Sequence, residues 1–356
     1  MVSPLNIIIM ILFQCDYNEG AHPQIIERLV QTNLEQTQGY GEDIYCQRAK
    51  ELIKEACGAP SADIHFMVGG TQTNATVISS ILRPYQGVIS ADTGHINVHE
   101  TGAIEHSGHK VLAVKGENGQ LTAQMIENVM AEHLEEDGPE HTVQPGMVYI
   151  SFPTEVGSIY SKKSLMEIRE VCDKYSLPLF IDGARLGYGL TSSQCDVSLK
   201  ELASLADVFY IGGTKQGALF GEAVVICNES LKKDFRYHIK QNGGMLAKGR
   251  LLGLQFETLF TDDLYFKIAA HANVQALRIK EAFAAKGFEF LMDSPTNQQF
   301  PIVTEGQAAI LGKDFGYTFW KRIDSERVAI RFCTSWATKT ENVDKLVDFI
   351  NNLERQ

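Results

Sequence analysis

Residue patterns that identify several common protein classes are missing from this sequence. The seven cysteines are odd in number and never stand as Cys-x-x-Cys, which argues against a disulfide framework and a zinc ribbon. We interpret most of them as small buried hydrophobic residues. Neither Gly-x-x-x-x-Gly-Lys nor Gly-x-Gly-x-x-Gly occurs. A Walker-type nucleotide site and a nicotinamide-dependent dehydrogenase are therefore disfavoured.

Positive charge is also scarce. The formal net charge is −12 at pH 7 and there is no basic run, so neither nucleic acid nor an anionic membrane is expected as the main partner. Residues 5–13 are apolar but too short to span a bilayer, and they lack the basic flank and cleavage site of a signal peptide. Residues 1–9 could be an extension ahead of a start at Met10. We expect a cytoplasmic protein that binds a small molecule.

Strands and helices alternate over the first two thirds of the chain. A helical stretch, residues 23–57, is interrupted at 39–43. Apolar runs then predict strands at 64–68, 88–91, 110–114, 147–152, 179–181, 208–211 and 223–227. Amphipathic patterns between them predict helices at 71–82, 122–135 and 163–175. This alternation is typical of βαβ units, so we expect an α/β fold with a mostly parallel central sheet and helices on both faces.

The pattern changes beyond residue 244. Helices are expected at 249–259, 263–286 and 342–353, with short strands near 288–291, 299–303 and 328–333. With 356 residues the chain is too long for one simple core. We therefore expect a large ligand-binding domain with an N-terminal segment over 14–250, and a small α+β domain over 251–356.

Polar residues follow four of the predicted strands. The carboxyl ends of parallel strands meet at one rim of a sheet, where ligands bind. Gly69-Gly70-Thr71 ends the first strand and opens a helix, which suits a phosphate or, alternatively, an ordinary helix capped by Thr71 or Thr73. Asp182 ends another strand, and a carboxylate there needs a cation. Arg185 or a ligand with a protonated ring nitrogen could supply it.

Lys215 stands on a glycine-bordered loop between the strands at 208–211 and 223–227. It could be a surface lysine on a turn. Near a carboxylate and away from water, its lowered pKa would instead make it a nucleophilic amine. Glu155 follows the fourth strand end.

His95 lies between these strand ends in the sequence. Its flat ring could stack on an aromatic ligand. The spacing of His95 and His99, with His106 and His109 beyond, also resembles a zinc set. Residues 96–98 do not read as helical and no acidic partners converge, so we expect no metal site.

One ligand meets all of these demands. A phosphate, an aldehyde that condenses with a lysine, a ring nitrogen that needs a carboxylate and a flat ring that needs a stacking partner together describe pyridoxal 5'-phosphate. The order of the glycine–threonine loop, His95, Asp182 and Lys215 makes the combination more specific than its parts.

The chain resembles the threonine aldolase/β-eliminating lyase family of pyridoxal-phosphate enzymes, which have the type I, aspartate aminotransferase-like fold. The resemblance extends from about Asp16 to the last helix. It is carried by Asp182-Gly-Ala-Arg-Leu186, by His95 ahead of Glu100-Thr-Gly102, and by Tyr40-Gly-Glu-Asp43.

The resemblance implies a role for each matching residue. Lys215 would form the Schiff base with the cofactor, and Asp182 would pair with its ring nitrogen. Arg185 would bind its phenolic oxygen, while His95 would stack on its ring. The phosphate would be bound by Gly70, Thr71 and one of Lys240, Lys248 and Arg250. The substrate would be bound by Arg331, Tyr40 and Asp16.

The implied activity is cleavage of L-threonine, L-allo-threonine or related L-β-hydroxy-α-amino acids to glycine and an aldehyde. His95 or Glu155 would be the base. A homodimer or homotetramer with shared active sites is implied as well. β-Elimination, phenylserine-type aldol cleavage and a non-catalytic cofactor-binding protein stay open as alternatives. Glu155 stands where many members have a histidine, and the 240–250 segment lacks the Gly-Gly-Gly-Met-Arg run, so the preferred aldehyde is left open.

Overall fold

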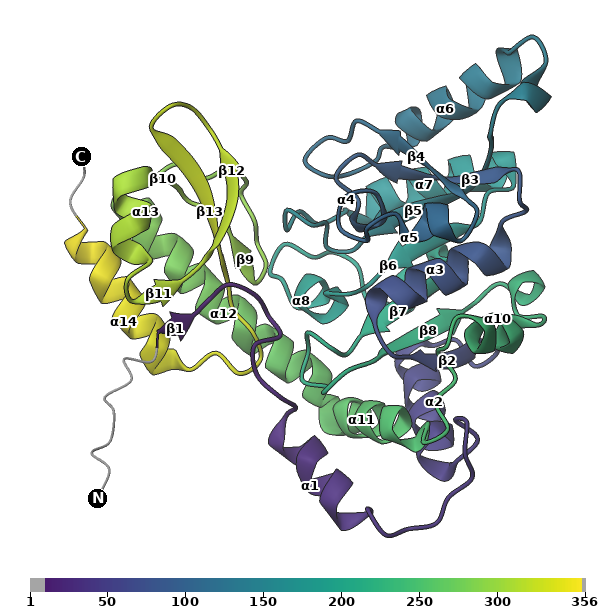
Figure 1. Ribbon diagram of the computed structural model, residues 1–356, viewed down its shortest axis with the longest axis horizontal. Coiled ribbons are helices and arrows are strands. Elements are labelled where there is room, and N and C mark those ends of the chain that lie inside the picture. Colours follow the sequence, from purple (N-terminus) through teal and green to yellow (C-terminus); the bar gives the residue numbers. More distant parts are fainter. Residues whose placement is uncertain (1–9, 354–356) are drawn as a thin grey trace.

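A seven-stranded sheet forms the centre of the larger part of the molecule in the computed structural model, which describes residues 10–353 (Figure 1). The apolar residues 5–9 lie outside this range. The strand order is β2-β8-β7-β6-β5-β3-β4. The strands are β2 (Asp63–Met67), β3 (Gln86–Ala91), β4 (Lys110–Val114), β5 (Gln144–Ser151), β6 (Leu179–Asp182), β7 (Val208–Gly212) and β8 (Glu222–Ile226).

The sheet is mostly parallel, as predicted. β3 to β7 pair in parallel, whereas β8 is antiparallel to both β7 and β2. β2 therefore runs in the same direction as the parallel strands, and only β8 is reversed. The carboxyl ends of the parallel strands share one rim with the first residue of β8.

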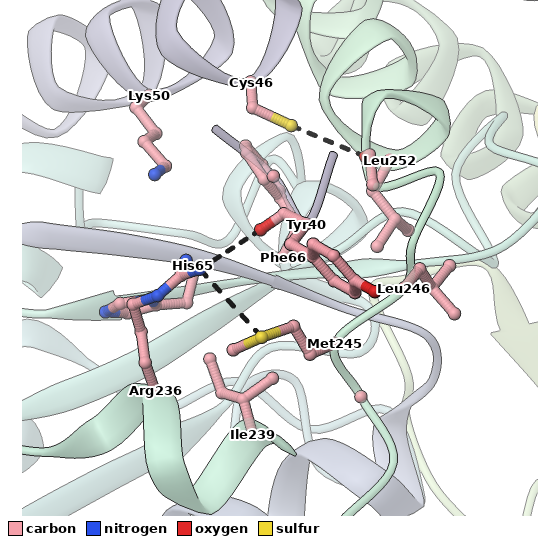
Figure 2. A pocket seen from close by; sticks show the side chains of 13 residues that line it. Tyr40, Cys46, Lys50, His65, Phe66, Arg236, Ile239, Met245, Leu246 and Leu252 are labelled. Carbon is pink, nitrogen blue, oxygen red and sulfur yellow. Dashed lines mark hydrogen bonds between the residues drawn. The ribbon is translucent and has the colours of Figure 1, made fainter. Parts of the chain in front are cut away.

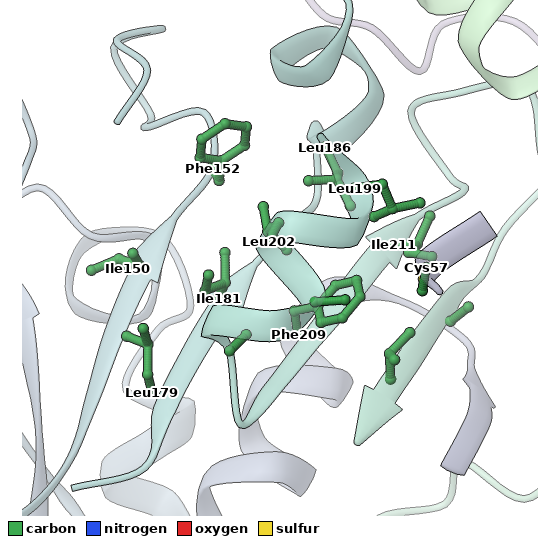
Figure 3. Packing of buried hydrophobic residues seen from close by; sticks show 14 of the residues in the cluster. Cys57, Ile150, Phe152, Leu179, Ile181, Leu186, Leu199, Leu202, Phe209 and Ile211 are labelled. Atoms are coloured by element: carbon green, nitrogen blue, oxygen red, sulfur yellow. The ribbon is translucent and has the colours of Figure 1, made fainter. Parts of the chain in front are cut away.

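Side chains on the two faces of the sheet belong to separate apolar cores. In β7, Phe209 and Ile211 join one core, and Val208 and Tyr210 join the other. Successive residues of a strand point to opposite faces, and a central strand is apolar on both. Figure 3 shows the first core, where Ile181 and Phe209 meet Leu202 of α9 (Leu199–Leu205).

Helices cover both faces (Figure 1). The first core also takes side chains from α1 (Pro23–Gln31), α2 (Ile44–Cys57), α6 (Ala123–Glu135) and α7 (Lys162–Tyr175), and the second from α3 (Gly70–Ile81) and α10 (Phe235–Gln241). Helices α9 and α10 were not predicted, although the Ser198–Glu201 capping box of α9 marks a helix start in the sequence. Short helices α4 (His95–Val98), α5 (Ala103–His106) and α8 (Leu186–Leu190) lie near the rim. The prediction that residues 96–98 are not helical is wrong, since α4 forms one helical turn there.

The C-terminal part is an α+β arrangement. Long helix α12 (Leu264–Ala285) leads from the large sheet to α14 (Thr340–Asn352), as Figure 1 shows. An antiparallel sheet joins β9 (Gln298–Gln299), β10 (Ile302–Thr304), β12 (Thr318–Arg322) and β13 (Arg327–Cys333). The expected strand at 288–291 is reduced to a single bridge between Phe290 and Pro301. The expected strand at 299–303 is split at Pro301, which has no N–H to donate. Helix α13 (Glu305–Leu311) and β12 were not predicted.

Two contacts join segments that are distant in the sequence. β1 (Ile11–Leu12) pairs in parallel with β11 (Phe315–Gly316), so the start of the described chain lies in the C-terminal part. Helix α11 (Arg250–Phe260) packs against α2 at Gly253, where a Cβ atom would lie 2.5 Å from the Cys46 backbone. A domain boundary between residues 250 and 251 stays a prediction. No helix within residues 10–353 is long and apolar enough to cross a membrane.

Candidate active site

A cavity of about 320 Å³ opens at the carboxyl-end rim of the large sheet. The segments after β2, β5, β6 and β7 all contribute to its lining, together with the first residue of β8. Of the predicted site residues, it is lined by Gly70, Thr71, His95, Glu155, Asp182, Arg185 and Lys215. Residues up to 145 positions apart in the sequence thus meet because their strands end at the same rim.

Asp182, the last residue of β6, is the most heavily hydrogen-bonded group in this cavity. Its Oδ2 accepts from the Tyr149 hydroxyl at 2.5 Å and the Asn74 amide at 3.1 Å. Its Oδ1 accepts from the Tyr210 hydroxyl at 2.5 Å and the Ala184 N–H at 2.9 Å. Burial alone would raise the pKa of Asp182, but the charge of His95 and these hydrogen bonds lower it below the ordinary value. Asp182 therefore stays a carboxylate.

The amine of Lys215 has no partner within residues 10–353. It makes no hydrogen bond or ion pair with any residue of the described range, while the Lys215 carbonyl is held by the Tyr188 hydroxyl at 2.5 Å. Burial and the nearby Arg185 guanidinium lower the pKa of Lys215, against the opposing effect of Asp16, Asp182 and Glu222. The backbone of Lys215 is thus fixed while its amine is available for chemistry.

His95 is held in a network of carboxylates and amides. Its Nδ1 lies 2.7 Å from Glu100 Oε1, which also accepts from the Asn74 amide at 2.7 Å. The backbone N–H of His95 donates to Glu155 Oε1 at 3.0 Å. Because Asn74 bonds both Glu100 and Asp182, one network orients the imidazole and the Asp182 carboxylate together.

Glu155 lies beside His95 and is held by a second hydrogen bond. Its Oε1 also accepts from the Ser151 hydroxyl at 2.6 Å. Burial raises the pKa of Glu155, and the charge of Asp182 adds to this effect, while the Ser151 hydrogen bond opposes it. A carboxylate with a raised pKa is suited to exchange a proton near neutral pH.

Helix α3 begins at this cavity without a side-chain cap. Its N-cap residue is Gly69, and no side chain bonds the first N–H groups. Thr73 donates its hydroxyl to the Gly69 carbonyl at 2.9 Å instead. The alternative that Thr71 or Thr73 caps the helix is therefore wrong. The free N–H groups of Gly70 and Thr71 form the start of a twelve-residue helix, where anions bind.

Arg185 pairs with Asp16 and not with Asp182. Its Nε and Nη2 donate to the two Asp16 oxygens at 2.7 and 3.0 Å, and the Asn297 amide donates to Asp16 Oδ2 at 2.9 Å. The interpretation of Arg185 as the cation for Asp182 is therefore wrong. Asp16 is fully buried behind Arg185 and does not line the cavity. Within one chain, Asp16 thus orients Arg185.

Comparisons with other proteins identify the family of this chain. Residues 16–305 match the family model described as β-eliminating lyase. A solved threonine aldolase of Leishmania major is 42% identical, with a TM-score of 0.94 over 96% of this chain and 99% of that one. This chain belongs to the threonine aldolase/β-eliminating lyase family.

Further relatives support the assignment. The low specificity L-threonine aldolase of Pseudomonas sp. (strain NCIMB 10558) is 30% identical over 94% of this chain and 95% of its own length. An aspartate aminotransferase of Thermus thermophilus is 14% identical, with a TM-score of 0.71 over 97% of this chain and 92% of that one. At that identity the likeness shows the fold alone. The family member described here thus has the aspartate aminotransferase-like type I fold.

Several predicted site residues of this family member lie away from the cavity. Arg331, on β13, donates to the Gln298 amide oxygen at 3.0 Å and the Gln14 carbonyl at 2.8 Å, while its buried Nε has no partner in the described chain. Arg250 donates hydrogen bonds to the carbonyl oxygens of Glu35 and Thr32. Lys248 stands just before α11, and its side chain is not part of the cavity lining.

Tyr40 and Lys240 face one another at a second, separate place. The Lys240 amine lies 5.1 Å from the centre of the Tyr40 ring. Beside them, a cavity of about 30 Å³ is lined by Tyr40, His65, Arg236 and other residues, none of which lines the Lys215 cavity (Figure 2). Burial lowers the pKa of His65 to about 3, so its imidazole is neutral there. One chain by itself does not bring Tyr40 and Lys240 to Lys215.

Sequence reasoning missed four site residues: Asn74, Tyr149, Tyr210 and Glu222. Tyr149 and Tyr210 look like core residues of apolar strands. Their one readable signal is that they lie two residues before a strand end, on the face that Asp182 also uses. Among the described residues, no group of three or more His, Cys, Asp or Glu side chains could hold a metal ion. The His95 and His99 rings are 5.6 Å apart.

Proposed function

We propose that this chain is a pyridoxal-phosphate-dependent carbon–carbon lyase that cleaves L-threonine, L-allo-threonine or related L-β-hydroxy-α-amino acids to glycine and an aldehyde. The observation that carries the proposal is the unpartnered Lys215 amine, in one cavity with the fully hydrogen-bonded Asp182 carboxylate. The threonine aldolases of Pseudomonas and Leishmania among the relatives support the substrate class.

The donor set of the cavity fits pyridoxal phosphate. Lys215 would hold its aldehyde carbon, Asp182 its ring nitrogen, the N–H groups of Gly70 and Thr71 its phosphate, and His95 the face of its ring. When bound, the cofactor supplies an aldehyde for the lysine and a ring that accepts the electron pair released when Cα–Cβ breaks.

The chain's own groups prepare that reaction. The lowered pKa of Lys215 increases the fraction of its amine that is neutral and nucleophilic. The lowered pKa of Asp182 keeps a negative charge where a protonated ring nitrogen requires one. The hydroxyls of Tyr149 and Tyr210 keep their protons, because burial and the Asp182 charge raise their pKa values well above the ordinary value. They therefore remain donors that hold Asp182 in place.

Proton transfer would use His95 or Glu155 in the cavity lining, and substrate binding would use Arg331, which lies outside that lining. Arg331 would bind the carboxylate of the amino acid, with its unpaired Nε as one donor. Glu155 or His95 would take the proton from the β-hydroxyl. The raised pKa of Glu155 and its contact with the His95 N–H support a base in this corner.

Aldehyde release tests the proposal directly. Purified protein loaded with pyridoxal phosphate is mixed with L-threonine, L-allo-threonine and phenylserine, and aldehyde and glycine are measured. Lys215→Ala is expected to abolish multiple turnover, and full activity of this variant would overturn the scheme. The second candidate is β-elimination, which the description of the matching family model favours. A 2-oxo acid and ammonia in place of glycine and aldehyde, namely 2-oxobutanoate from threonine or phenylpyruvate from phenylserine, would identify it.

A shared active site would explain the position of Tyr40 and Lys240. We propose that the protein forms a homodimer or homotetramer in which this pair contributes to the cavity of a neighbouring copy. Tyr40 is about half exposed, at 48%, and so is available for such a contact. Sizing at micromolar concentration that shows only monomer would contradict this arrangement. A cytoplasmic location is part of the same proposal.

A further inference from the structure

Glu222 occupies a position in the cavity that the proposed function does not use. It is the first residue of β8, the reversed strand of the sheet. Its Cα pairs with Met67 at the end of β2 on one side and with Gly212 at the end of β7 on the other. Glu222 therefore stands between the Gly70–Thr71 helix start and the Lys215 loop, and it lines the cavity with both.

Both carboxyl oxygens of Glu222 are held by the lysine loop. Oε2 accepts the Gly213 N–H at 3.0 Å and Oε1 accepts the Thr214 hydroxyl at 2.9 Å. Thr214 Oγ1 accepts the Gly221 N–H at 3.0 Å, which closes the loop from its other end. No cation pairs with Glu222 in the described part of the chain. The side chain is fixed, and only 4% of its surface is exposed.

Negative charge is costly at this position. The groups that interact electrostatically with Glu222 are Lys215, Asp182, Tyr210 and Tyr265. Burial raises the pKa of Glu222 to about 8, and the Asp182 charge adds to this, against the hydrogen bonds and Lys215. Both tyrosines keep their protons because their pKa values lie well above the ordinary value. Glu222 is thus a neutral carboxylic acid at neutral pH.

We propose that neutral Glu222 completes the anion-binding end of the cavity and that its ionisation expels the phosphate of a bound ligand. As an acid, Glu222 has an O–H that it can donate to a phosphate oxygen, and it adds no charge beside the helix start. As a carboxylate it would repel a phosphate dianion held at the helix start of the same cavity. The inference rests on the proposed function only in placing a phosphate at Gly70 and Thr71.

The sign of the pH effect follows from the raised pKa. Below about pH 8 the acid form dominates and phosphate retention is unaffected. As pH rises through that value, the carboxylate form accumulates and retention falls. A glutamine at this position stays neutral at every pH, and its amide oxygen can still accept the Thr214 hydroxyl. Phosphate retention by the wild-type protein and by Glu222→Gln should therefore differ only at alkaline pH.

The experiment measures the dissociation constant of pyridoxal phosphate from pH 6.5 to 9.5 for the wild-type protein, Glu222→Gln and the surface control Glu289→Gln. We expect similar dissociation constants for the three proteins near pH 7. By pH 9.5 the dissociation constants of the wild type and the control should be about tenfold higher than that of Glu222→Gln. Because Glu222 raises the pKa of Lys215, Glu222→Gln also affects imine formation, so binding of inorganic phosphate, which forms no imine, is measured in parallel over the same pH range.

Each outcome has one meaning. Parallel pH profiles for the wild type and Glu222→Gln would overturn the role of Glu222 and leave the proposed function standing. Absence of pyridoxal phosphate binding in all three proteins would overturn the proposed function itself. If Glu222→Gln does not fold, Glu222→Asp takes its place, because it keeps an acid with a shorter reach. Its alkaline loss of retention should then persist with a displaced midpoint, and a flat profile for both it and the wild type would refute the proposal.

Discussion

Replacing Asp16 by asparagine removes the negative charge from the most enclosed ion pair of the described residues. The Asp16 side chain is 0% exposed and that of Arg185 12%, and their two contacts measure 2.7 and 3.0 Å. Asp16→Asn would leave the Arg185 guanidinium buried without a counter-charge. Loss of one partner of a buried pair costs about 3–5 kcal/mol, so we expect a loss of stability in that range.

The pH dependence of stability gives a second, independent magnitude. The pKa of Asp16 is lowered from 3.8 to about 2, because the charges of Arg185 and Lys215 and two hydrogen bonds outweigh the effect of burial. A group with a lowered pKa adds stability above its unfolded value and loses it as pH falls through its folded value. The wild type should therefore lose about 2 kcal/mol between pH 5 and pH 2 through this group alone. Asp16→Asn should lack that component.

Urea unfolding followed by circular dichroism measures both effects at one fixed protein concentration. Unfolding midpoints are compared, because a chain with two packed parts need not unfold in two states. Asp344→Asn is the matched control, since Asp344 forms an exposed pair with Arg278 and should lose far less stability. A loss for Asp16→Asn no larger than for the control would show that Arg185 does not depend on Asp16.

Three further substitutions test the roles proposed for Asp182, Glu155 and Arg331. Asp182→Asn should lower kcat by about two orders of magnitude with little change in KM, since it removes the charge that the ring nitrogen requires, and steady-state kinetics checks this. If Glu155 is the base, activity should fall as pH drops through its raised pKa, and Glu155→Gln should remove this acidic limb of the pH–rate profile. An unchanged acidic limb would assign the role of the base to His95. Arg331→Gln should raise KM by about tenfold or more while the cofactor spectrum stays unchanged, through loss of a charged hydrogen bond to the substrate carboxylate. An unaltered KM would place the carboxylate elsewhere.

Much of the large sheet and the central part of the site could be predicted from sequence because their signals are local. Apolar runs that stop at glycine or a polar residue locate strand ends, and parallel strand ends share a rim. Local pattern alone therefore places Asp182 and Lys215 at one edge of the sheet. The weaker predictions were in the C-terminal part, where strands of two or three residues carry almost no periodicity.

Pairing between distant residues was decided only by the tertiary structure. Asp182, three residues away, was one candidate partner for Arg185, but Arg185 pairs with Asp16, 169 positions earlier in the chain. Asn74 reads as an ordinary helix residue, yet it joins Glu100 to Asp182 across two strand ends. No spacing rule encodes such contacts, because they depend on which strands are neighbours in the sheet.

Glu222 illustrates the same division. By itself the sequence determined a glycine-bordered lysine on a loop that is followed by an apolar strand, and so made Lys215 a candidate for a reactive amine. Only the tertiary structure showed that this strand lies antiparallel between β7 and β2, which brings its first residue to the rim where the other strands end. The connection 213–221 is too short for a parallel crossover, but the place of β8 beside β2 depends on packing on both faces of the sheet. That packing places a buried acid beside the lysine and the helix start.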